Sequence, residues 1–170
     1  MQIHIRVATS ADLPAIERLY AHADVYHQRA LARFFSPIEG PARPAAYLQE
    51  CLDRDDATIL LAKDVHGDKD GDAVGLVHLY ERATPPVPML VPRRYLVIEG
   101  IVVLPEAQRA GVGSALLQHA EAWALSRGLD EVELTVWEFN VGARQFYEAQ
   151  GYATVRRSMW KPLDGAEEGP

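Results

Sequence analysis

Hydrophobic positions in the first half of the chain follow strand spacing and helix spacing in turn. Alternating apolar and polar residues predict a strand at 3–7. Ser10 then precedes apolar residues at helical spacing, and we expect it to cap a helix. A further helix is predicted at about 44–52, followed by strands at about 58–62 and 73–80.

The second half shows a regular alternation of elements. A continuous apolar run at 95–104 is typical of a central strand covered on both faces. The pattern then predicts a helix at 111–126, a strand at 132–136, a second helix at 140–151 that begins at Asn140, and a final strand at 152–160. This order indicates an α/β (α+β) fold with a mixed sheet and helices on both faces.

Length and composition are those of an ordinary globular protein. The chain has 170 residues, of which 48% are hydrophobic and 24% charged, so we expect one domain at 1–161 and a flexible tail at 162–170. The net charge of −7 disfavours nucleic acid and anionic membranes as partners, and it suits a cationic substrate. Cys51 is the single cysteine, and the first residues do not resemble a signal peptide. We therefore expect a cytoplasmic protein without disulfides.

The segment Gln108-Arg109-Ala110-Gly111-Val112-Gly113-Ser114 joins the central strand to a helix. Backbone N–H groups converge at a helix N-terminus, where the helix dipole adds partial positive charge and glycines let an anion approach closely. The segment therefore predicts a phosphate-binding turn. Tight packing at a strand-to-helix turn would also explain the two glycines. A dinucleotide fingerprint would need a glycine at Leu116, and a P-loop would need a lysine that is absent.

The same segment resembles the Gln/Arg-x-x-Gly-x-Gly/Ala motif of the GNAT superfamily of N-acetyltransferases. The residues at 101–105 and at 140–152 also resemble the motifs that flank it in that family. The resemblance implies a mixed, mostly antiparallel central sheet of six to seven strands, splayed after the fourth strand and flanked by about four helices. It also implies an acyltransferase that uses acetyl-CoA as co-substrate.

The family resemblance assigns the expected cofactor contacts. In the family, the pantetheine arm pairs with the strand before the motif, and Gly100 within that strand suggests a bulge or close packing. The family also has an Asn that contacts the cofactor, matched by Asn140, and a Tyr that protonates the departing thiolate, matched by Tyr147. Asn140 equally suits a helix cap, and Tyr147 a core position. The expected cofactor-binding set is Ile101, Val102, Val103, Gln108, Arg109, Ala110, Gly111, Val112, Gly113, Ser114, Asn140 and Tyr147.

Glu99 is the candidate general base because it is a carboxylate inside an otherwise apolar strand. Such a carboxylate is costly to bury unless it is paired or faces a wet cleft, and desolvation there would raise its pKa towards values useful for catalysis. The alternative is a structural ion pair with Arg93, Arg94 or another cation. In the catalytic interpretation Glu99 deprotonates the amine, which attacks the thioester, and Tyr147 protonates the thiolate.

The acceptor is not specified by these motifs. We expect a small-molecule amine, with a peptide or protein lysine as the alternative. A non-catalytic acyl-CoA-binding or regulatory module on the same fold is the other alternative, because a fold does not prove turnover. No metal is expected, and the chain is expected to be a monomer or a homodimer.

Overall fold

The structure, a computed structural model, describes residues 1–37, 39–65 and 71–163. The chain forms two compact units, each described here by itself. The first comprises Met1–Asp24 with Ile38–Thr135, and the second comprises Val25–Pro37 with Val136–Pro170. Most of the predicted tail, 164–170, lies outside the described residues.

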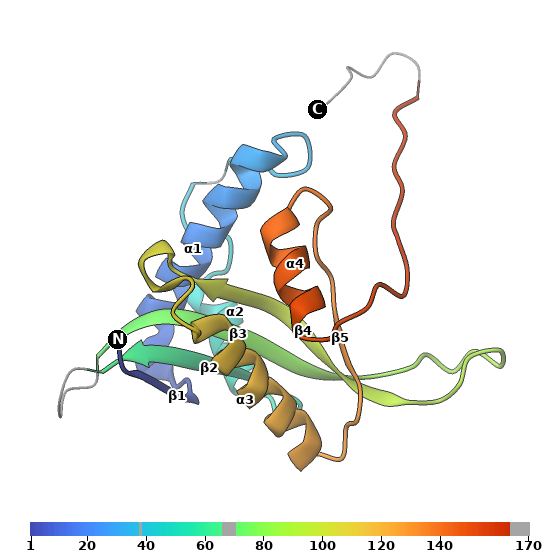
Figure 1. The fold of residues 1–170 in the computed structure, drawn as a ribbon, viewed down its shortest axis with the longest axis horizontal. Helices are drawn as coiled ribbons and strands as arrows, with labels where there is room; N and C mark the ends of the chain where they lie inside the picture. Colours follow the sequence, from blue (N-terminus) through green and yellow to red (C-terminus); the bar gives the residue numbers. More distant parts are fainter. Residues whose placement is uncertain (38, 66–70, 164–170) are drawn as a thin grey trace. The chain divides into compact units, whose positions relative to one another are not determined.

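A five-stranded sheet forms the centre of the first unit (Figure 1). Its strands lie in the order β1 (Ile3–Val7), β2 (Ala57–Asp64), β3 (Asp72–Ala83), β4 (Arg94–Val103) and β5 (Val132–Leu134). Neighbouring strands are antiparallel except β4 and β5, which are parallel. The helices are α1 (Leu13–Ala30), α2 (Ala45–Leu52), α3 (Val112–Ser126) and α4 (Val141–Ala149), with 3-10 turns η1 (Ser10–Asp12) and η2 (Pro105–Ala107). The predicted mixed, mostly antiparallel fold is confirmed.

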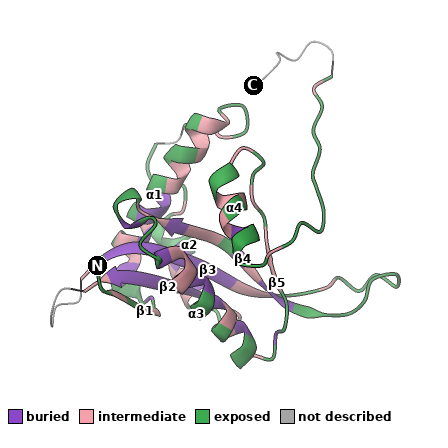
Figure 2. Ribbon diagram, viewed as in Figure 1, coloured by how far each residue is buried: buried purple, intermediate pink, exposed green. Residues whose placement is uncertain are grey.

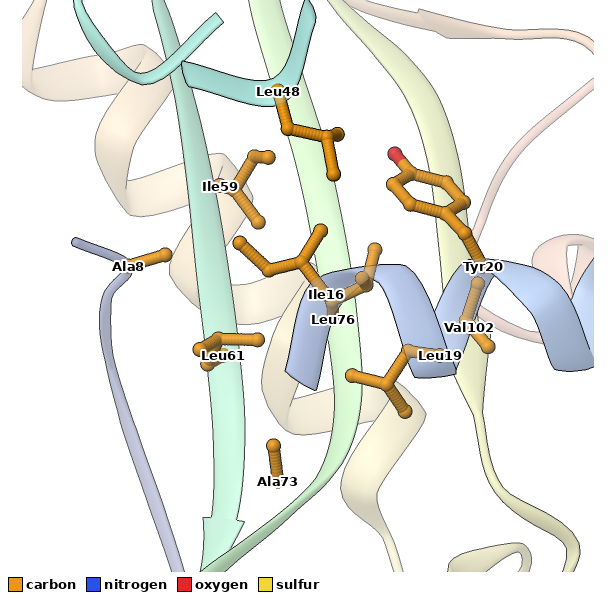
Figure 3. Close-up of a cluster of buried hydrophobic side chains, with 10 residues drawn as sticks. All are labelled: Ala8, Ile16, Leu19, Tyr20, Leu48, Ile59, Leu61, Ala73, Leu76 and Val102. Atoms are coloured by element: carbon orange, nitrogen blue, oxygen red, sulfur yellow. The ribbon is translucent and has the colours of Figure 1, made fainter. Parts of the chain in front are cut away.

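Helices cover the two faces of this sheet. On one face, apolar side chains of α1 and α2 pack on β2, β3 and β4; Figure 3 shows Ile16, Leu19, Tyr20, Leu48, Ile59, Leu61, Leu76 and Val102 in this core. On the other face α3 contributes Leu116, Leu117, Ala120 and Ala124, all buried. Strand residues alternate between the faces, so β2 and β3 are buried along most of their length (Figure 2).

The start of α1 differs from the prediction. Thr9, not Ser10, is the N-cap, and it caps the 3-10 turn η1 that leads into α1; its backbone N–H and hydroxyl both donate to the Asp12 carboxylate. Arg6 from β1 donates to the two oxygens of the same carboxylate at 2.8 and 2.7 Å. Because one buried carboxylate satisfies donors from both β1 and the helix start, it fixes the angle between these elements.

The number of strands is lower than the predicted six to seven. The described residues form five strands, and the segment predicted as the last strand, 152–160, is extended but belongs to no sheet. Its composition favours a strand, yet a strand needs a hydrogen-bonded neighbour. That neighbour is a matter of tertiary structure and is not encoded in the local pattern.

The second unit contains α4 and a cluster of aromatic side chains. Ring contacts at 5.1–6.5 Å link residues of 25–37 with residues of 136–160, namely Tyr26, His27, Phe34, Phe35, Trp137, Phe139 and Trp160. Edge-to-face and tilted geometries of this kind are favourable for aromatic pairs. The cluster therefore joins two segments that are distant in sequence.

Among the described helices, none combines the length and the apolar character that a membrane crossing requires.

Candidate functional site

The N-terminus of α3 offers unpaired backbone donors. Gly111 is its N-cap and provides no side-chain cap, and the first helical hydrogen bond is donated by Ala115 to the Gly111 carbonyl. Within the described residues, the N–H groups of Val112, Gly113 and Ser114 therefore have no acceptor. These donors and the helix dipole suit a phosphate group.

The backbone before α3 is shaped so that an anion can approach. Arg109 and Gly111 both have positive φ, 59° and 82°. A Cβ built on Gly111 meets no atom within 4 Å, so packing does not explain this glycine and the tight-packing alternative is not supported there. Ala110 between them is exposed, as is Arg109, which has no ion pair among the described residues. The predicted turn thus provides backbone donors, open space and one exposed cation.

The bulge predicted from Gly100 lies in β4 at Glu99. Gly100 pairs with His78 and Ile98 pairs with Leu79, so Glu99 is the extra residue. In such a bulge two consecutive residues oppose one on the neighbouring strand, and the alternation of hydrogen-bonding direction shifts by one position. The bulge therefore changes the edge of β4 towards which the backbone N–H and C=O groups of each later residue point.

Hydrogen bonds on either side of the bulge show this change. Before it, the N–H of Leu96 donates towards β5, to Glu131 O at 2.9 Å. After it, the N–H of Leu104 donates towards β3, to Val74 O at 2.9 Å. Alternation then directs the backbone groups of Ile101 and Val103 away from β3.

That side of β4 has no strand beside it after the bulge. The pairing of β4 with β5 ends at Ile98 and Leu134. Among the described residues, the Val103 carbonyl accepts from the Gln108 side chain at 3.1 Å, whereas Ile101 has no backbone partner on this edge. The predicted splay after the fourth strand is confirmed, and the open edge leads directly to the α3 turn.

Glu99 itself is exposed, so the expectation that it is buried in an apolar strand is wrong. The bulge accounts for the difference, because it removes this residue from the regular alternation of buried and exposed positions. The alternative role as a structural partner of Arg93 or Arg94 is not supported. Arg93 pairs with Glu131 and Glu133, and Arg94 pairs with Glu81.

The negative charge of Glu99 acts on three tyrosines from three elements. Burial raises the pKa of Tyr20 on α1, Tyr47 on α2 and Tyr80 on β3, and the charge of Glu99 raises each pKa further. The three phenols therefore stay protonated at neutral pH, in the electric field of one carboxylate.

The deepest of these phenols is held by a buried histidine. The Tyr20 hydroxyl lies 3.0 Å from His78 Nδ1. The Tyr20 ring also lies close to Gly100, because a Cβ added to this glycine would be 3.6 Å from the ring. The Arg43 guanidinium stacks on the Tyr20 ring, 4.0 Å from the ring centre, and donates to both oxygens of the Asp24 carboxylate. Sequence patterns did not identify these residues, because they come from four segments without a common motif.

His78 gives the fold a measurable pH dependence. Burial lowers the pKa of His78 to about 4, and the positive charge of Arg43 contributes. Because the unfolded pKa is about 6.5, the stabilising effect is complete above that pH and is lost as the pH falls towards 4. We expect this loss to be on the order of 3 kcal/mol of unfolding free energy.

Chemical denaturation of wild type and His78→Gln between pH 7 and pH 4.5 measures this effect. The difference in unfolding free energy between the two should shrink as the pH falls. His119→Gln, at an exposed position on α3, is the matched control and should keep the wild-type slope. A constant difference between wild type and His78→Gln would contradict the assignment.

Asn140 and Tyr147 belong to the second unit. Asn140 is the N-cap of α4, and its side-chain oxygen accepts from the Ala143 N–H at 3.1 Å, which confirms the cap and leaves its amide donors for another partner. Tyr147 is 8% exposed and its ring contacts those of Phe146 and Tyr152. Burial raises the pKa of Tyr147 above its usual value, and Tyr152 adds to the effect. The phenol therefore stays protonated, as a proton donor must.

Among residues 1–37, 39–65 and 71–163, no group of three His, Cys, Asp or Glu side chains is arranged to hold a metal ion.

Comparisons with known proteins agree with this geometry. Residues 14–152 match the acetyltransferase (GNAT) family model. An aminoglycoside N(6')-acetyltransferase type 1 of Klebsiella aerogenes is 33% identical over 139 residues, covering 81% of this chain and 78% of the relative. An uncharacterized N-acetyltransferase of Bacillus subtilis is 27% identical over 150 residues, covering 88% and 89%. A crystallised Bacillus halodurans protein has a TM-score of 0.87 at 22% identity, covering 94% and 99%. The chain therefore belongs to the GNAT family of acetyltransferases, enzymes for which acetyl-CoA is the co-substrate.

Proposed function

We propose that this acetyltransferase transfers the acetyl group to the amine of a small cationic molecule. The observation that carries the proposal is the exposed Glu99 carboxylate at the bulge of β4, beside the open edge of the strand, where its charge acts on Tyr20, Tyr47 and Tyr80. A carboxylate attracts an ammonium group, and the exposed ring of Tyr47 would add cation–π attraction. The name of the Klebsiella aerogenes relative identifies aminoglycosides as its acetyl acceptors, and this supports a small cationic amine as the acceptor class.

The proposed cofactor contacts follow the strand and the turn. The pantetheine arm would pair with the backbone of Ile101 and Val103, and the pyrophosphate would bind the free N–H groups of α3, with Arg109 contributing charge. The Val102 side chain packs in the core and its backbone groups face β3, where Val102 pairs with Leu76, so no direct cofactor contact is proposed for Val102. Asn140 is proposed as a further cofactor contact from its match to the family motif.

In the proposed reaction, Glu99 removes a proton from the ammonium group, directly or through water. The neutral nitrogen attacks the thioester carbonyl, a carbon–nitrogen bond forms and the carbon–sulfur bond breaks. The free N–H of Val103 would stabilise the oxyanion, Tyr147 would give its proton to the thiolate, and the proton that the nitrogen loses on becoming an amide would restore the Tyr147 phenol. Holding the two substrates together supplies a large part of the acceleration.

Release of the coenzyme A thiol across an amine panel tests the acceptor class. The panel comprises aminosugars, aliphatic polyamines, amino acids and a lysine-containing peptide, and calorimetry measures acetyl-CoA binding in parallel. We expect thiol release with a polycationic small molecule. Release with the peptide alone would overturn the small-molecule proposal. Acetyl-CoA binding without release for any acceptor would favour the non-catalytic module.

Replacing Tyr147 by Phe tests its proposed role as the proton donor. We expect kcat to fall by about 10- to 100-fold while the dissociation constant of acetyl-CoA changes by less than about twofold, because only the hydroxyl is lost. Steady-state kinetics and calorimetry measure the two quantities. Tyr26→Phe makes the same chemical change at an exposed position and should leave kcat unchanged. Wild-type turnover in Tyr147→Phe would remove this residue from the mechanism.

A further inference from the structure

The face of the sheet that α1 covers continues along β3 to Tyr80. Two residues earlier on the same face lies His78, which contacts Tyr20 of α1. Tyr80 is half-buried, and its backbone lies between Ala57 of β2 and Val97 of β4. Because a strand lies on each side, the sheet fixes the position from which the Tyr80 side chain projects.

Glu99 is the diagonal neighbour of Tyr80 on β4. It follows Val97 by two residues, and Val97 lies opposite Tyr80, so the three side chains lie on one face of the sheet. Diagonal neighbours are about 7–8 Å apart, within reach of an aromatic side chain. Burial is the largest of the causes that raise the pKa of Tyr80, and the charge of Glu99 and a side-chain hydrogen bond with Glu99 add to it. The register and the hydrogen bond therefore agree.

The other two phenols in the electric field of this carboxylate have different hydrogen-bond partners. The Tyr20 hydroxyl forms its hydrogen bond with His78 Nδ1 at 3.0 Å, and the Tyr47 hydroxyl forms one with the Cys51 side chain. Both of these tyrosines belong to helices, α1 and α2. Among the described residues, Tyr80 is therefore the tyrosine whose hydroxyl is shared with the carboxylate.

We propose that Tyr80 is a positioning residue for the general base: its hydroxyl donates to one oxygen of Glu99 and leaves the other oxygen for the acceptor ammonium. The inference rests on the proposed role of Glu99 in the reaction. An exposed glutamate samples several rotamers, and holding it in one of them reduces the entropy that is lost when the acceptor reaches a reactive geometry. Tyr80 itself exchanges no proton with the substrate.

A double-mutant cycle in the kinetics tests this role. Tyr80→Phe removes only the hydroxyl, and we expect kcat/KM for the acceptor to fall about tenfold while the dissociation constant of acetyl-CoA changes by less than about twofold. In the Glu99→Gln background the same substitution should change kcat/KM by less than about twofold, because the base that it orients is gone. Tyr95→Phe removes the hydroxyl of a buried tyrosine of β4 and should leave kcat/KM unchanged in both backgrounds.

The outcomes of this cycle separate the inference from the proposed function. An equal loss from Tyr80→Phe in both backgrounds would indicate a structural role and would overturn the inference. A wild-type rate in Tyr80→Phe, with Glu99→Gln impaired, would overturn the inference and leave the base in place. A wild-type rate in Glu99→Gln would refute the base itself, and the positioning role with it.

A measurement without catalysis tests the contact itself. Burial raises the pKa of Tyr80, Glu99 and Tyr95 of β4 raise it further, and Arg82 of β3 lowers it. With tyrosines labelled at Cζ, carbon NMR follows the ionisation of Tyr80, whose signal is identified by its loss in Tyr80→Phe. We expect Tyr80 to ionise at a lower pH in Glu99→Gln, and at the wild-type pH in Glu50→Gln, which removes an exposed carboxylate of α2. The same midpoint in Glu99→Gln and wild type would overturn the contact.

Discussion

Glu99→Gln is expected to lower kcat/KM for the amine acceptor by about 10²- to 10³-fold at neutral pH, the range over which a general base accelerates proton transfer. The substitution keeps the size of the side chain and removes the negative charge that acts on Tyr20, Tyr47 and Tyr80. Because Glu99 is exposed, the unfolding free energy should change by less than about 0.5 kcal/mol. Steady-state kinetics with the acceptor from the panel and chemical denaturation measure both quantities.

The pH profile separates a base from a residue that only binds the acceptor. As the pH rises towards the pKa of the acceptor amine, more of the amine is already neutral and needs no base, so the variant should approach wild type. A residue that only binds the acceptor would instead raise KM and leave kcat at saturating acceptor unchanged across the profile. Glu50→Gln removes a carboxylate at an exposed position on α2 and should retain wild-type kinetics. An undiminished rate in Glu99→Gln at neutral pH would exclude Glu99 as the base.

Gly75→Ala is expected to destabilise the first unit by about 3 kcal/mol, at the upper end of the range for overpacking. A Cβ at this position would lie 2.8 Å from the backbone oxygen of Val102, 3.3 Å from Leu116 and 3.4 Å from Val112. Leu116 and Val112 are buried on α3, so neither can move freely, and the Val102 oxygen belongs to β4. The strain therefore acts on the strand and the helix that form the candidate cofactor site.

Gly142→Ala is the matched control. Gly142 lies in α4, and a Cβ there meets no atom within 4 Å, so the same added methyl should stabilise the helix by about 0.5–1 kcal/mol. Denaturant unfolding of both variants gives the comparison. If Gly75→Ala were as stable as Gly142→Ala, β3, β4 and α3 would not be packed as closely as the structure has them.

Sequence patterns predicted the elements of the first unit because their signals are local. Each signal lies within a short stretch of sequence: the alternation in β1, the apolar run of β4, and the glycines at the two ends of α3. The helix cap at Asn140 was likewise readable from its own segment. By contrast, the cap at Thr9, which begins the η1 turn before α1, depends on Asp12 being held by Arg6 of β1, which the local helix pattern does not contain.

The candidate site was only partly predictable for the same reason. Gly100 indicated a bulge, but its effect on Glu99 follows from pairing with His78 and Leu79 of a different strand. The exposure of Glu99 was therefore missed. Tyr20 and His78 were missed as well, because each resembles an ordinary core residue until the fold brings their side chains to 3.0 Å.

By itself the sequence determined the order of elements from β1 to α4, the position of the strand-to-helix turn at 108–114 and the family, since these are carried by short contiguous segments with characteristic spacing. The tertiary structure alone decided which edge of β4 its backbone groups face after the bulge, the exposure of Glu99, and the number of strands in the described sheet. The physical reason is that strand pairing and burial are properties of contacts between distant segments. A local pattern can state that a residue favours such a contact, but it does not name the partner.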